Sequence, residues 1–467
     1  MSWEPVIGLE IHVQLQTRTK MFCACALGFA EPPNTRTCPV CLGLPGSLPV
    51  VNERAIHFGL MIGLALDCEL APRSIFHRKN YFYPDLPKGY QISQYDEPLC
   101  GAGRLGEVRI HRVHLEEDAA KLTHIGASGR IHGSQGSVVD FNRGGTPLVE
   151  IVTEPDVRSP EQAREWLGVL RETLRALDVS DVNMEEGSLR CDANVSLRPA
   201  GSDVLGTKTE LKNMNSFRYL ERGVQAEIAR QSEILDGGGE VEQQTLHFDP
   251  ASGAITALRS KEEAHDYRYF PEPDLVPIAI TAEMLSAARA ALPELPAARA
   301  ARFERSLGIN AASARLLAFR SELGDLFEAA LAGTSHAQTL ANWVERFGEA
   351  DPADSKLTPT ALAELVEMIE AKELSGTAAR QVWDVLRERG GEPRGLVASL
   401  GLGALDDAEE LAAIVAGVIS AHADVAAKVR SGNANAIGAL IGPAMKATRG
   451  RADGARIREL IIDQLQE

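Results

Sequence analysis

Residues 6–15 read VIGLEIHVQL, and from Leu9 onward apolar and polar side chains alternate. Residues 108–115, VRIHRVHL, follow the same two-residue pattern. Because successive side chains of a β-strand point to opposite faces, both segments predict strands with one polar face. A helical pattern with Ser159 as its N-cap and Pro160 in its first turn covers residues 159–177. Strands and helices in no regular βαβ order predict an α+β fold with a large antiparallel sheet.

The composition of the chain changes near residue 290. Residues 271–277 read PEPDLVP, which cannot form a regular helix and which predicts an extended strap or linker. Beyond it the chain is rich in Ala, Leu, Glu and Arg and reads as helical, with a break at residues 390–393. We therefore predict three domains, namely an α+β domain over 1–290, a helical connecting domain over 291–395, and a small helical tail domain over 396–467.

The net charge of the 467 residues is −17, from 48 Lys and Arg against 65 Asp and Glu. Such a balance argues against a general nucleic-acid coat protein, which needs an excess of basic side chains to neutralise phosphates. The sign reverses locally, because residues 428–458 carry seven basic side chains against Asp453 alone, a net charge of +6. This basic segment reads either as a solvated helix face or as a surface that contacts the backbone of a folded RNA.

Neither a membrane segment nor an export signal is expected. No stretch of about 18 uncharged apolar residues occurs, and the first five residues, MSWEP, lack the basic and apolar regions of a signal peptide. Four of the seven cysteines crowd between Cys23 and Cys41. These features predict a cytoplasmic protein with reduced thiols.

The clustered cysteines form a CxC pair, Cys23 and Cys25, and a CxxC pair, Cys38 and Cys41. Four thiolates in two such pairs suit tetrahedral Zn²⁺, and no histidine or open position lies between them, so the predicted zinc is structural. Two other interpretations remain: four ordinary thiols, or a redox CxxC, although no thioredoxin-like βαβ context surrounds the motif.

Acidic side chains are unusually dense in the predicted strands and turns. Glu10 and His12 are two residues apart, so they share one strand face. Carboxylates that converge from several strands repel one another unless cations lie among them, and Mg²⁺ prefers oxygen ligands. Each of these residues taken alone reads as solvated surface. The group as a whole predicts a Mg²⁺ site, and it comprises Glu10, His12, Glu116, Glu117, Asp118, Glu150, Glu154, Glu185, Glu186, Asp192 and Glu210.

Basic stretches rich in Gly and Asn accompany these acids, at residues 78–85, 142–147 and 206–216. Cationic side chains beside metal-binding carboxylates are typical of phosphoryl transfer, because they stabilise charge on the transferred oxygens. The chain has no GxxxxGK[ST] loop, and no GxGxxG follows a predicted strand, so P-loop and Rossmann sites are not expected. From the residues alone we predict an enzyme that uses a nucleotide or a phosphate.

Long ordered motifs in the first predicted domain resemble the GatB family, whose members are subunits of the tRNA-dependent amidotransferases. The resemblance lies in residues 6–15, 78–85, 90–96, 114–119, 144–156, 183–194, 212–218 and 266–275. It implies an ATP-dependent, kinase-like first domain related in fold to glutamine synthetase. In that family the domain phosphorylates the side-chain carboxylate of Glu on tRNA(Gln) or of Asp on tRNA(Asn).

The resemblance also implies partners. Ammonia that an amidase (glutaminase) partner releases from glutamine displaces the phosphate, and a small third subunit clasps the complex. The cognate non-discriminating aminoacyl-tRNA synthetase is a further candidate partner. Two other functions stay open: a zinc-stabilised tRNA-binding scaffold without chemistry of its own, and a free-standing carboxylate–amine ligase that acts on a small molecule.

Site residues follow from the same resemblance. It implies Mg²⁺ ligands and catalytic residues at Glu10, His12 and Glu117, and further catalytic residues at Lys79 and Glu210. Glu150, Asp192 and Glu210 are expected near a second, ATP-linked ion. Phosphate contacts are expected from Lys79, Arg143, Lys208 and Lys212, with Asn213 and Asn215 orienting the nucleotide. His12 has the alternative reading of a hydrogen-bonded strand histidine, and Tyr81, Tyr83 and Tyr90 either stack on a base or pack in the core. The tail resembles a tRNA-contacting domain, with the expected contacts at Lys446, Arg449, Arg451 and Arg456.

Overall fold

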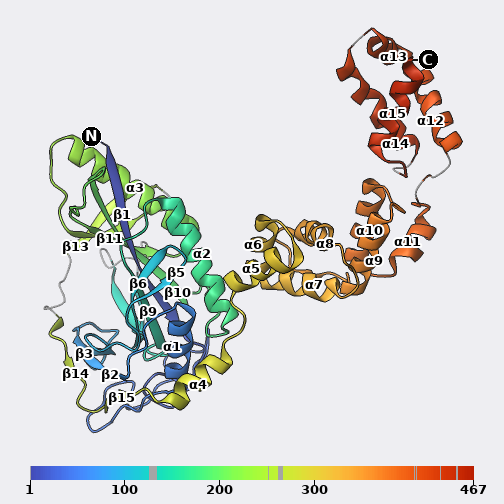
Figure 1. The fold of residues 1–467 in the computed structure, drawn as a ribbon. Helices are drawn as coiled ribbons and strands as arrows, with labels where there is room; N and C mark the ends of the chain where they lie inside the picture. Colours follow the sequence, from blue (N-terminus) through green and yellow to red (C-terminus); the bar gives the residue numbers. More distant parts are fainter. Residues whose placement is uncertain are drawn as a thin grey trace. The chain divides into compact units, whose positions relative to one another are not determined.

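An eight-stranded sheet organises the first part of the chain, and β1 (Trp3–Gln14) is one of its central strands (Figure 1). In the computed structural model the strand order is β13-β12-β11-β10-β1-β9-β6-β5. Every neighbouring pair is antiparallel except β11 and β12, which are parallel. The predicted combination of helices with a large, mainly antiparallel sheet is therefore confirmed. The other strands of this sheet are β5 (Gly103–Leu105), β6 (Val108–Glu117), β9 (Pro147–Thr153), β10 (Leu189–Pro199), β11 (Thr209–Met214), β12 (Gln244–Phe248) and β13 (Ile255–Ser260).

The structure describes residues 2–125, 134–250, 252–260, 267–403, 405, 408–431, 433–448 and 451–466. Within these ranges, the side chains of residues 213, 258–260, 408 and 434 lie outside the description. The chain divides into two compact units, Met1–Leu295 and Pro296–Glu467.

Alternation places the apolar side chains of the sheet on one face. Leu9, Ile11 and Val13 of β1 are fully buried and belong to the core of the first unit. The two-residue pattern of 108–115 is broken at His111-Arg112, two polar residues in succession, and the register between β6 and β9 shifts there. This irregularity keeps Val108 and Ile110 on the same apolar face as the later residues of β6.

Helices cover the apolar face of the sheet. α3 (Phe217–Asp236) packs on β10 and β11, α2 (Pro160–Ala176) packs on α3, and α1 (Glu53–Ala65) packs on β6. The predicted helix over 159–177 is confirmed: the Ser159 side chain accepts a hydrogen bond from the amide of Gln162, and Pro160 occupies the first turn. The helices therefore leave the opposite, polar face of the strands available for a functional site.

Short elements complete the first unit. Residues 271–277, predicted to form an extended strap or linker, contain no helix, but only their start is a strand. There β14 pairs with β3, and a turn follows at Pro273 and Asp274. The shorter elements are β2 (Arg73–Ser74), β3 (His77–Asn80), β4 (Tyr90–Ser93), β7 (Lys121–Ile125), β8 (Gly136–Asp140), β14 (Phe270–Pro271), β15 (Ile278–Ala279) and α4 (Ala282–Ala291).

The described part of the second unit is helical and holds two separate hydrophobic clusters, within residues 300–402 and 405–465. The predicted domain boundaries near residues 290 and 395 stay predictions. The helices are α5 (Pro296–Leu307), α6 (Ala311–Phe319), α7 (Ser321–Leu331), α8 (Ala337–Val344), α9 (Pro359–Glu370), α10 (Gly376–Arg389), α11 (Pro393–Leu400), α12 (Ala408–Ala421), α13 (Ala423–Arg430), α14 (Gly438–Ala447) and α15 (Gly454–Gln466).

Among the described residues, no single helix is long and apolar enough to cross a membrane. The helices over Glu409–Ala421 and Ala423–Arg430 reach that length and composition only when they are taken together, and the chain bends by 95° between them.

Candidate active site on the polar face of the sheet

Strand register brings the polar residues of several strands together on the open face of the sheet. His12 on β1 lies opposite Glu150 on β9 and opposite Arg190 on β10. Glu10 lies opposite Asp192, again across the β1–β10 pair. Residues far apart in the sequence therefore become neighbours because β1 is paired on both sides. The same face carries His114 and Glu116 of β6, Asn194 of β10, and Glu210 and Lys212 of β11.

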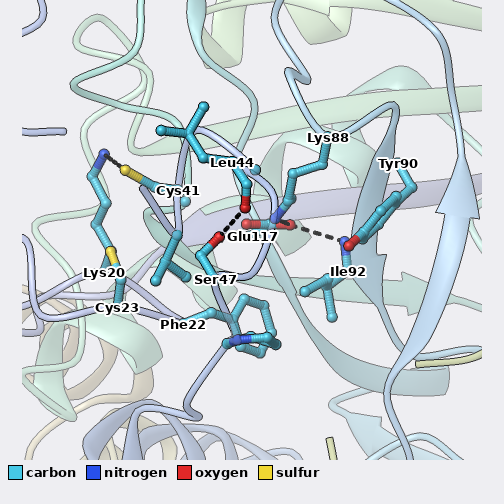
Figure 2. Close-up of a pocket in the computed structure, with 14 residues that line it drawn as sticks. Lys20, Phe22, Cys23, Cys41, Leu44, Ser47, Lys88, Tyr90, Ile92 and Glu117 are labelled. Carbon is cyan, nitrogen blue, oxygen red and sulfur yellow. Dashed lines mark hydrogen bonds and ion pairs between the residues drawn. The ribbon is translucent and has the colours of Figure 1, made fainter. Parts of the chain in front are cut away.

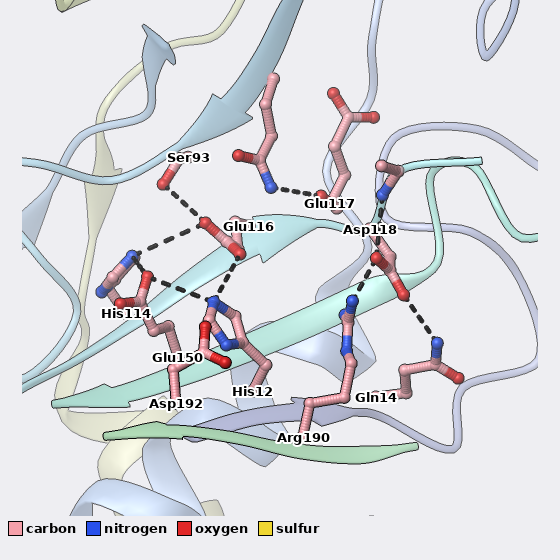
Figure 3. Close-up of polar contacts among 12 residues, drawn as sticks. His12, Gln14, Ser93, His114, Glu116, Glu117, Asp118, Glu150, Arg190 and Asp192 are labelled. Carbon is pink, nitrogen blue, oxygen red and sulfur yellow. Dashed lines mark hydrogen bonds and ion pairs between the residues drawn. The ribbon is translucent and has the colours of Figure 1, made fainter. Parts of the chain in front are cut away.

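Two histidines and two glutamates form the closest cluster on this face (Figure 3). The His12 Nε2 atom lies 3.7 Å from a carboxylate oxygen of Glu116 and 3.8 Å from one of Glu150. The Nε2 atom of His114 lies 3.0 Å from Glu150, and the Ser93 hydroxyl donates a hydrogen bond to Glu116. His12, Glu116 and Glu150 offer ligand atoms that all lie within 4.8 Å of one another, so these three residues fit a metal ion.

The electrostatics of this cluster favour ionised carboxylates. Burial opposes the charge of Glu150, yet the neighbouring His114, His12 and Lys79 hold the pKa of this carboxyl well below its usual range. Burial likewise opposes the charge of Glu116, and its hydrogen bond with His114 is the main cause that lowers its pKa. The two glutamates are thus held as anions, which is the form that binds a metal.

Lys212 holds a second acidic group. Its ammonium lies 2.7 Å from Asp192 and 3.0 Å from Glu210, and burial of the ammonium is outweighed by these carboxylates, which raise the pKa of the lysine. Glu10 accepts a hydrogen bond from the Asn194 amide at 2.8 Å. The sequence grouped Glu150 with Asp192 and Glu210 around a second ion, but the structure places Glu150 with His12 and fills the space between the other two with Lys212.

Arg190 and Asp118 form a third group, at the end of β1. A terminal nitrogen of Arg190 donates to Asp118 at 2.9 Å, and the Gln14 side-chain amide donates to the other oxygen of Asp118 at 2.7 Å. Burial opposes the charge of Asp118, but Arg190 and Arg143 outweigh it and lower the pKa of this carboxyl. Arg143, a predicted phosphate contact, donates to the backbone carbonyls of Ala119 and Ala120 and lies 3.7 Å from Asp118.

One cavity of about 240 Å³ connects these groups. Lys79 lies on its wall, and the pKa of its ammonium is raised because Tyr269, Glu116 and Glu150 outweigh the effect of burial. The Lys79 ammonium also lies 4.8 Å from the centre of the Tyr267 ring. The lining residues with functional groups are His12, Lys79, Tyr81, Gln91, Glu116, Asp118, Arg190, Lys212 and Tyr267.

Glu10 and Lys208 line a separate cavity of about 230 Å³. Lys208 belongs to the exposed loop before β11, and Asn215 is exposed directly after that strand. The side chain of Asn213 lies outside the described residues. Of the described side chains, those of Glu10, Lys208 and Asn215 therefore do not line the cavity that contains His12.

Glu117 points to the other side of β6 (Figure 2). Its carboxylate pairs with Lys88 and accepts a hydrogen bond from the amide of Ile92 at 3.0 Å. It lines a cavity of about 170 Å³ together with Lys20 and Cys41. The structure thus places Glu117 away from His12 and brings its neighbour Glu116 there instead.

The sequence interpretation gave no specific role to His114, Glu116, Asp118 or Arg190. Counting by twos from His114 along the strand reaches Glu116, so alternation was a signal for this residue. For Arg190 and Asp118 no local signal exists, because their meeting depends on the pairing of β1 with β10. Tyr81 lines this cavity and Tyr90 packs under the Arg78 guanidinium. The predicted alternatives of base stacking and core packing stay predictions.

The four cysteines predicted to bind zinc lie together, each half-buried and none in a disulfide. Their sulfur atoms all lie within 4.8 Å of one another, and sulfurs of a tetrahedral zinc site with bonds of about 2.3 Å are about 3.8 Å apart. The hydrogen bond from Cys23 lowers the pKa of Cys41, and the Lys20 ammonium 3.7 Å away acts in the same direction. The group of Cys23, Cys25, Cys38 and Cys41 could therefore hold a metal, and its all-thiol donor set is compatible with structural zinc.

The basic segment of the tail is partly exposed. Lys446 near the end of α14 and Arg456 in α15 are exposed, whereas Arg451 lies 3.6 Å from Glu410. Arg449 lies outside the described residues. In the described part of the chain, Lys446 and Arg456 are thus exposed and available for contact with tRNA. The third residue, Arg451, forms an ion pair with Glu410.

Comparison with known proteins assigns both units to one family. Residues 5–286 match the family described as the GatB/GatE catalytic domain, and residues 325–465 match the GatB domain. The chain is 52% identical to the B subunit of the aspartyl/glutamyl-tRNA(Asn/Gln) amidotransferase of Frankia casuarinae, over 99% of this chain and 96% of the relative. It is 46% identical to the corresponding protein of Geotalea daltonii and 47% identical to that of Moorella thermoacetica, over the full length of both chains in each case.

Proposed function

Because the chain belongs to the B subunits of the aspartyl/glutamyl-tRNA(Asn/Gln) amidotransferases, we propose that its polar sheet face activates an amino acid carried by tRNA. The proposed substrate is Glu on tRNA(Gln) or Asp on tRNA(Asn), and the activated group is its side-chain carboxylate. The cavity of about 240 Å³ carries this proposal, because it joins a metal-binding acidic cluster to basic side chains that suit phosphate.

The proposed reaction has two steps. A carboxylate oxygen attacks the γ-phosphorus of ATP, the bond to the β-phosphate oxygen breaks, and ADP leaves with that electron pair. The nitrogen of ammonia then attacks the acyl carbon, the carbon–oxygen bond to phosphate breaks, and phosphate leaves as the amide nitrogen loses a proton. The acceptor carboxylate is ionised at neutral pH, so the first step needs no strong general base.

The residues of the cluster would hold Mg²⁺. His12, Glu116 and Glu150 are the proposed ligands, since their ligand atoms converge and the two carboxyls are held as anions. Mg²⁺ bound there would neutralise charge on the phosphates. Lys79 and Lys212 face the same cavity and would contact phosphate oxygens, while the walls at Tyr81 and Tyr267 limit the access of water to an acyl phosphate.

We assign the four cysteines a structural Zn²⁺. The site has four protein ligands and no open position, and it lies apart from the cavity that contains His12. The proposed partners are an amidase that supplies ammonia, a small third subunit, and the cognate aminoacyl-tRNA synthetase. The basic segment over 428–458 would contact the folded tRNA.

A non-catalytic tRNA-binding scaffold is the second candidate function. The cysteine cluster and the basic tail support it, because neither of them requires chemistry in this chain. The convergence of His12, Glu116 and Glu150 favours the enzyme instead, since a scaffold has no need for buried, ionised carboxylates around one cavity.

An assay of the assembled enzyme separates the two candidates. The complex with its partner subunits is given ATP, ammonium chloride, and either Glu-tRNA(Gln) or Asp-tRNA(Asn), and ADP and the amidated product are measured. We expect ADP formation that depends on the misacylated tRNA and is lost in Glu150→Gln. ADP formation at the wild-type rate in that variant would contradict the proposed site, and no tRNA-dependent ADP formation in the wild type would favour the scaffold.

A further inference from the structure

Arg190 has more hydrogen-bonding capacity than its neighbours use. A guanidinium carries five N–H groups, and in the described part of the chain only one of those of Arg190 has a partner, the carboxylate of Asp118. The Nε atom is buried without any partner. The side chain is nevertheless 39% exposed and lines the cavity that contains His12. A cation that is anchored at one nitrogen and open at others is suited to hold an anion.

Arg190 has one close carboxylate partner, while Glu116 and Asp192 act on its charge from further away. Asp118 is the single carboxylate of the described residues within 4 Å of Arg190, and it is shared with Arg143. The Arg143 guanidinium is directed to the carbonyls of Ala119 and Ala120. Two guanidinium groups therefore share one carboxylate, and of the two only Arg190 lines the cavity.

The two lysines of the cavity have surroundings that differ from those of Arg190. Lys212 lies within 3.0 Å of two carboxylates, Asp192 and Glu210. Lys79 is half-buried against the ring of Tyr267 and in the field of Glu116 and Glu150. Arg190 is thus the cation of this cavity that combines a carboxylate anchor with N–H groups that have no partner in the described part of the chain.

We infer that Arg190 clamps the anionic oxygens of the reacting group, and that Asp118 and Gln14 position its guanidinium (Figure 3). This inference rests on the proposed function and adds to it a residue that the sequence did not indicate. The planar fork of arginine fits two oxygens of a carboxylate or of a phosphoryl group. Because β1 pairs with β10, Arg190 lies opposite His12, so the clamped oxygens are held beside the proposed metal ligands.

The strand itself offers a matched control. Arg198 is also on β10 and also pairs with a carboxylate, that of Glu4 at 3.1 Å, but it does not line the cavity. We would compare Arg190→Gln, Arg190→Lys, Arg190→Ala and Arg198→Gln in the assembled enzyme, with ATP, misacylated tRNA and ammonium chloride. Thermal unfolding of each variant would be measured in parallel.

We expect Arg190→Gln to lower kcat/KM by about 100- to 1,000-fold, as the loss of a charge-stabilising donor does. Arg190→Lys should lower kcat/KM by a smaller factor, because lysine retains the charge. Added guanidinium should partly restore the activity of Arg190→Ala. A raised KM for ATP would identify the clamped group as phosphoryl, and a raised KM for the misacylated tRNA would identify it as the carboxylate. Arg190→Gln with the activity and both KM values of Arg198→Gln would overturn the inference.

A double-mutant cycle tests the positioning role of Asp118. If Asp118 acts through Arg190, the pair Asp118→Asn and Arg190→Gln should be no worse than Arg190→Gln alone. If the losses of kcat/KM in the two single variants add up in the double variant, Asp118 does not act through Arg190. If the wild-type enzyme forms no ADP in response to misacylated tRNA, the proposed function itself is wrong. If the wild type is active and Arg190→Gln behaves like Arg198→Gln, only this inference is wrong.

Discussion

Two adjacent glutamates on β6 have different surroundings because successive side chains of a strand point to opposite faces of the sheet. Glu116 faces His12 on the polar side of the sheet, whereas Glu117 faces Lys88 on the other side. We predict that Glu116→Gln raises the Mg²⁺ concentration needed for half-maximal amidation, because it removes a charged ligand from the proposed site. A Mg²⁺ titration of the activity measures this effect.

Glu117→Gln is the informative comparison. It should leave the Mg²⁺ midpoint unchanged but lower the free energy of unfolding by about 3–5 kcal/mol, because Lys88 is then buried without its partner. Urea unfolding monitored by circular dichroism gives this value. A shift of the Mg²⁺ midpoint in Glu117→Gln that equals the shift in Glu116→Gln would place the metal elsewhere.

The sequence predicted some residues of the site and not others for a physical reason. His12 and Glu10 share a face by alternation within one strand, so local spacing was sufficient. Glu116 could have been found in the same way, by counting from His114. The Arg190–Asp118 pair could not, since these residues are 72 positions apart in the sequence. They meet only because β10 pairs with β1, β1 with β9, and β9 with β6, which ends directly before Asp118.

At the scale of elements, the cysteine loop is joined to the segment that precedes β9. The Asn34 backbone amide donates to Asp140, and the Asn34 side chain accepts from the amide of Phe141. The Arg36 amide donates to the side chain of Asn142, and the Lys20 ammonium donates to the carbonyl of Phe141. The segment continues to Gly145 and Thr146, whose backbones exchange hydrogen bonds with Asp118. The cysteine loop is therefore linked, through residues 140–146, to Asp118 in the wall of the cavity that contains His12.

We predict that removal of the metal loosens this segment before it unfolds the unit. Chelation of the purified protein, or Cys38→Ser, should increase amide hydrogen exchange in residues 136–146, because the loop that holds them loses its crosslink. Exchange measured by mass spectrometry reports this change, and α2 serves as the internal control since it packs in the core. If amide exchange in residues 136–146 is the same with and without chelator, the loop is held without a metal.

Whole strands and helices were easier to predict than their arrangement. The strand predicted over residues 6–15 extends from Trp3 to Gln14, and its residues Val6 to Leu9 are all buried, so they show no alternation. The parallel pairing of β11 with β12 has no local signature, and it needs α3 as the connection between the strands. Periodicity reports which side of an element is buried, but it does not name the neighbour that buries it.

At the scale of the molecule, the chain consists of two units with separate hydrophobic cores. We predict that residues 296–467 fold when they are produced alone, because their apolar side chains are buried within the unit. Circular dichroism should show a helical spectrum and urea a cooperative transition. A fragment that is unfolded until residues 1–295 are added would contradict the division. Two transitions within the fragment would support the predicted boundary near residue 395.

The charge of the molecule is also divided. A total of −17 disfavours a nonspecific grip on RNA, but the net charge of +6 over residues 428–458 permits a local one. This segment is part of the unit that holds no residue of the proposed catalytic cavity. Contact with tRNA and chemistry on its amino acid are therefore assigned to different units, and changes in the tail should alter binding without altering the chemical step.

We predict that Lys446→Ala together with Arg456→Ala weakens tRNA binding by the full-length chain. Each lost phosphate contact should reduce the slope of log Kd against log salt concentration by about one unit. The control is Lys372→Ala with Arg380→Ala, which removes the same charge from exposed sites outside the basic segment. Filter binding at several salt concentrations gives the slopes. If both double variants shift the slope equally, only the net charge matters; if neither does, the basic segment is a solvated helix face.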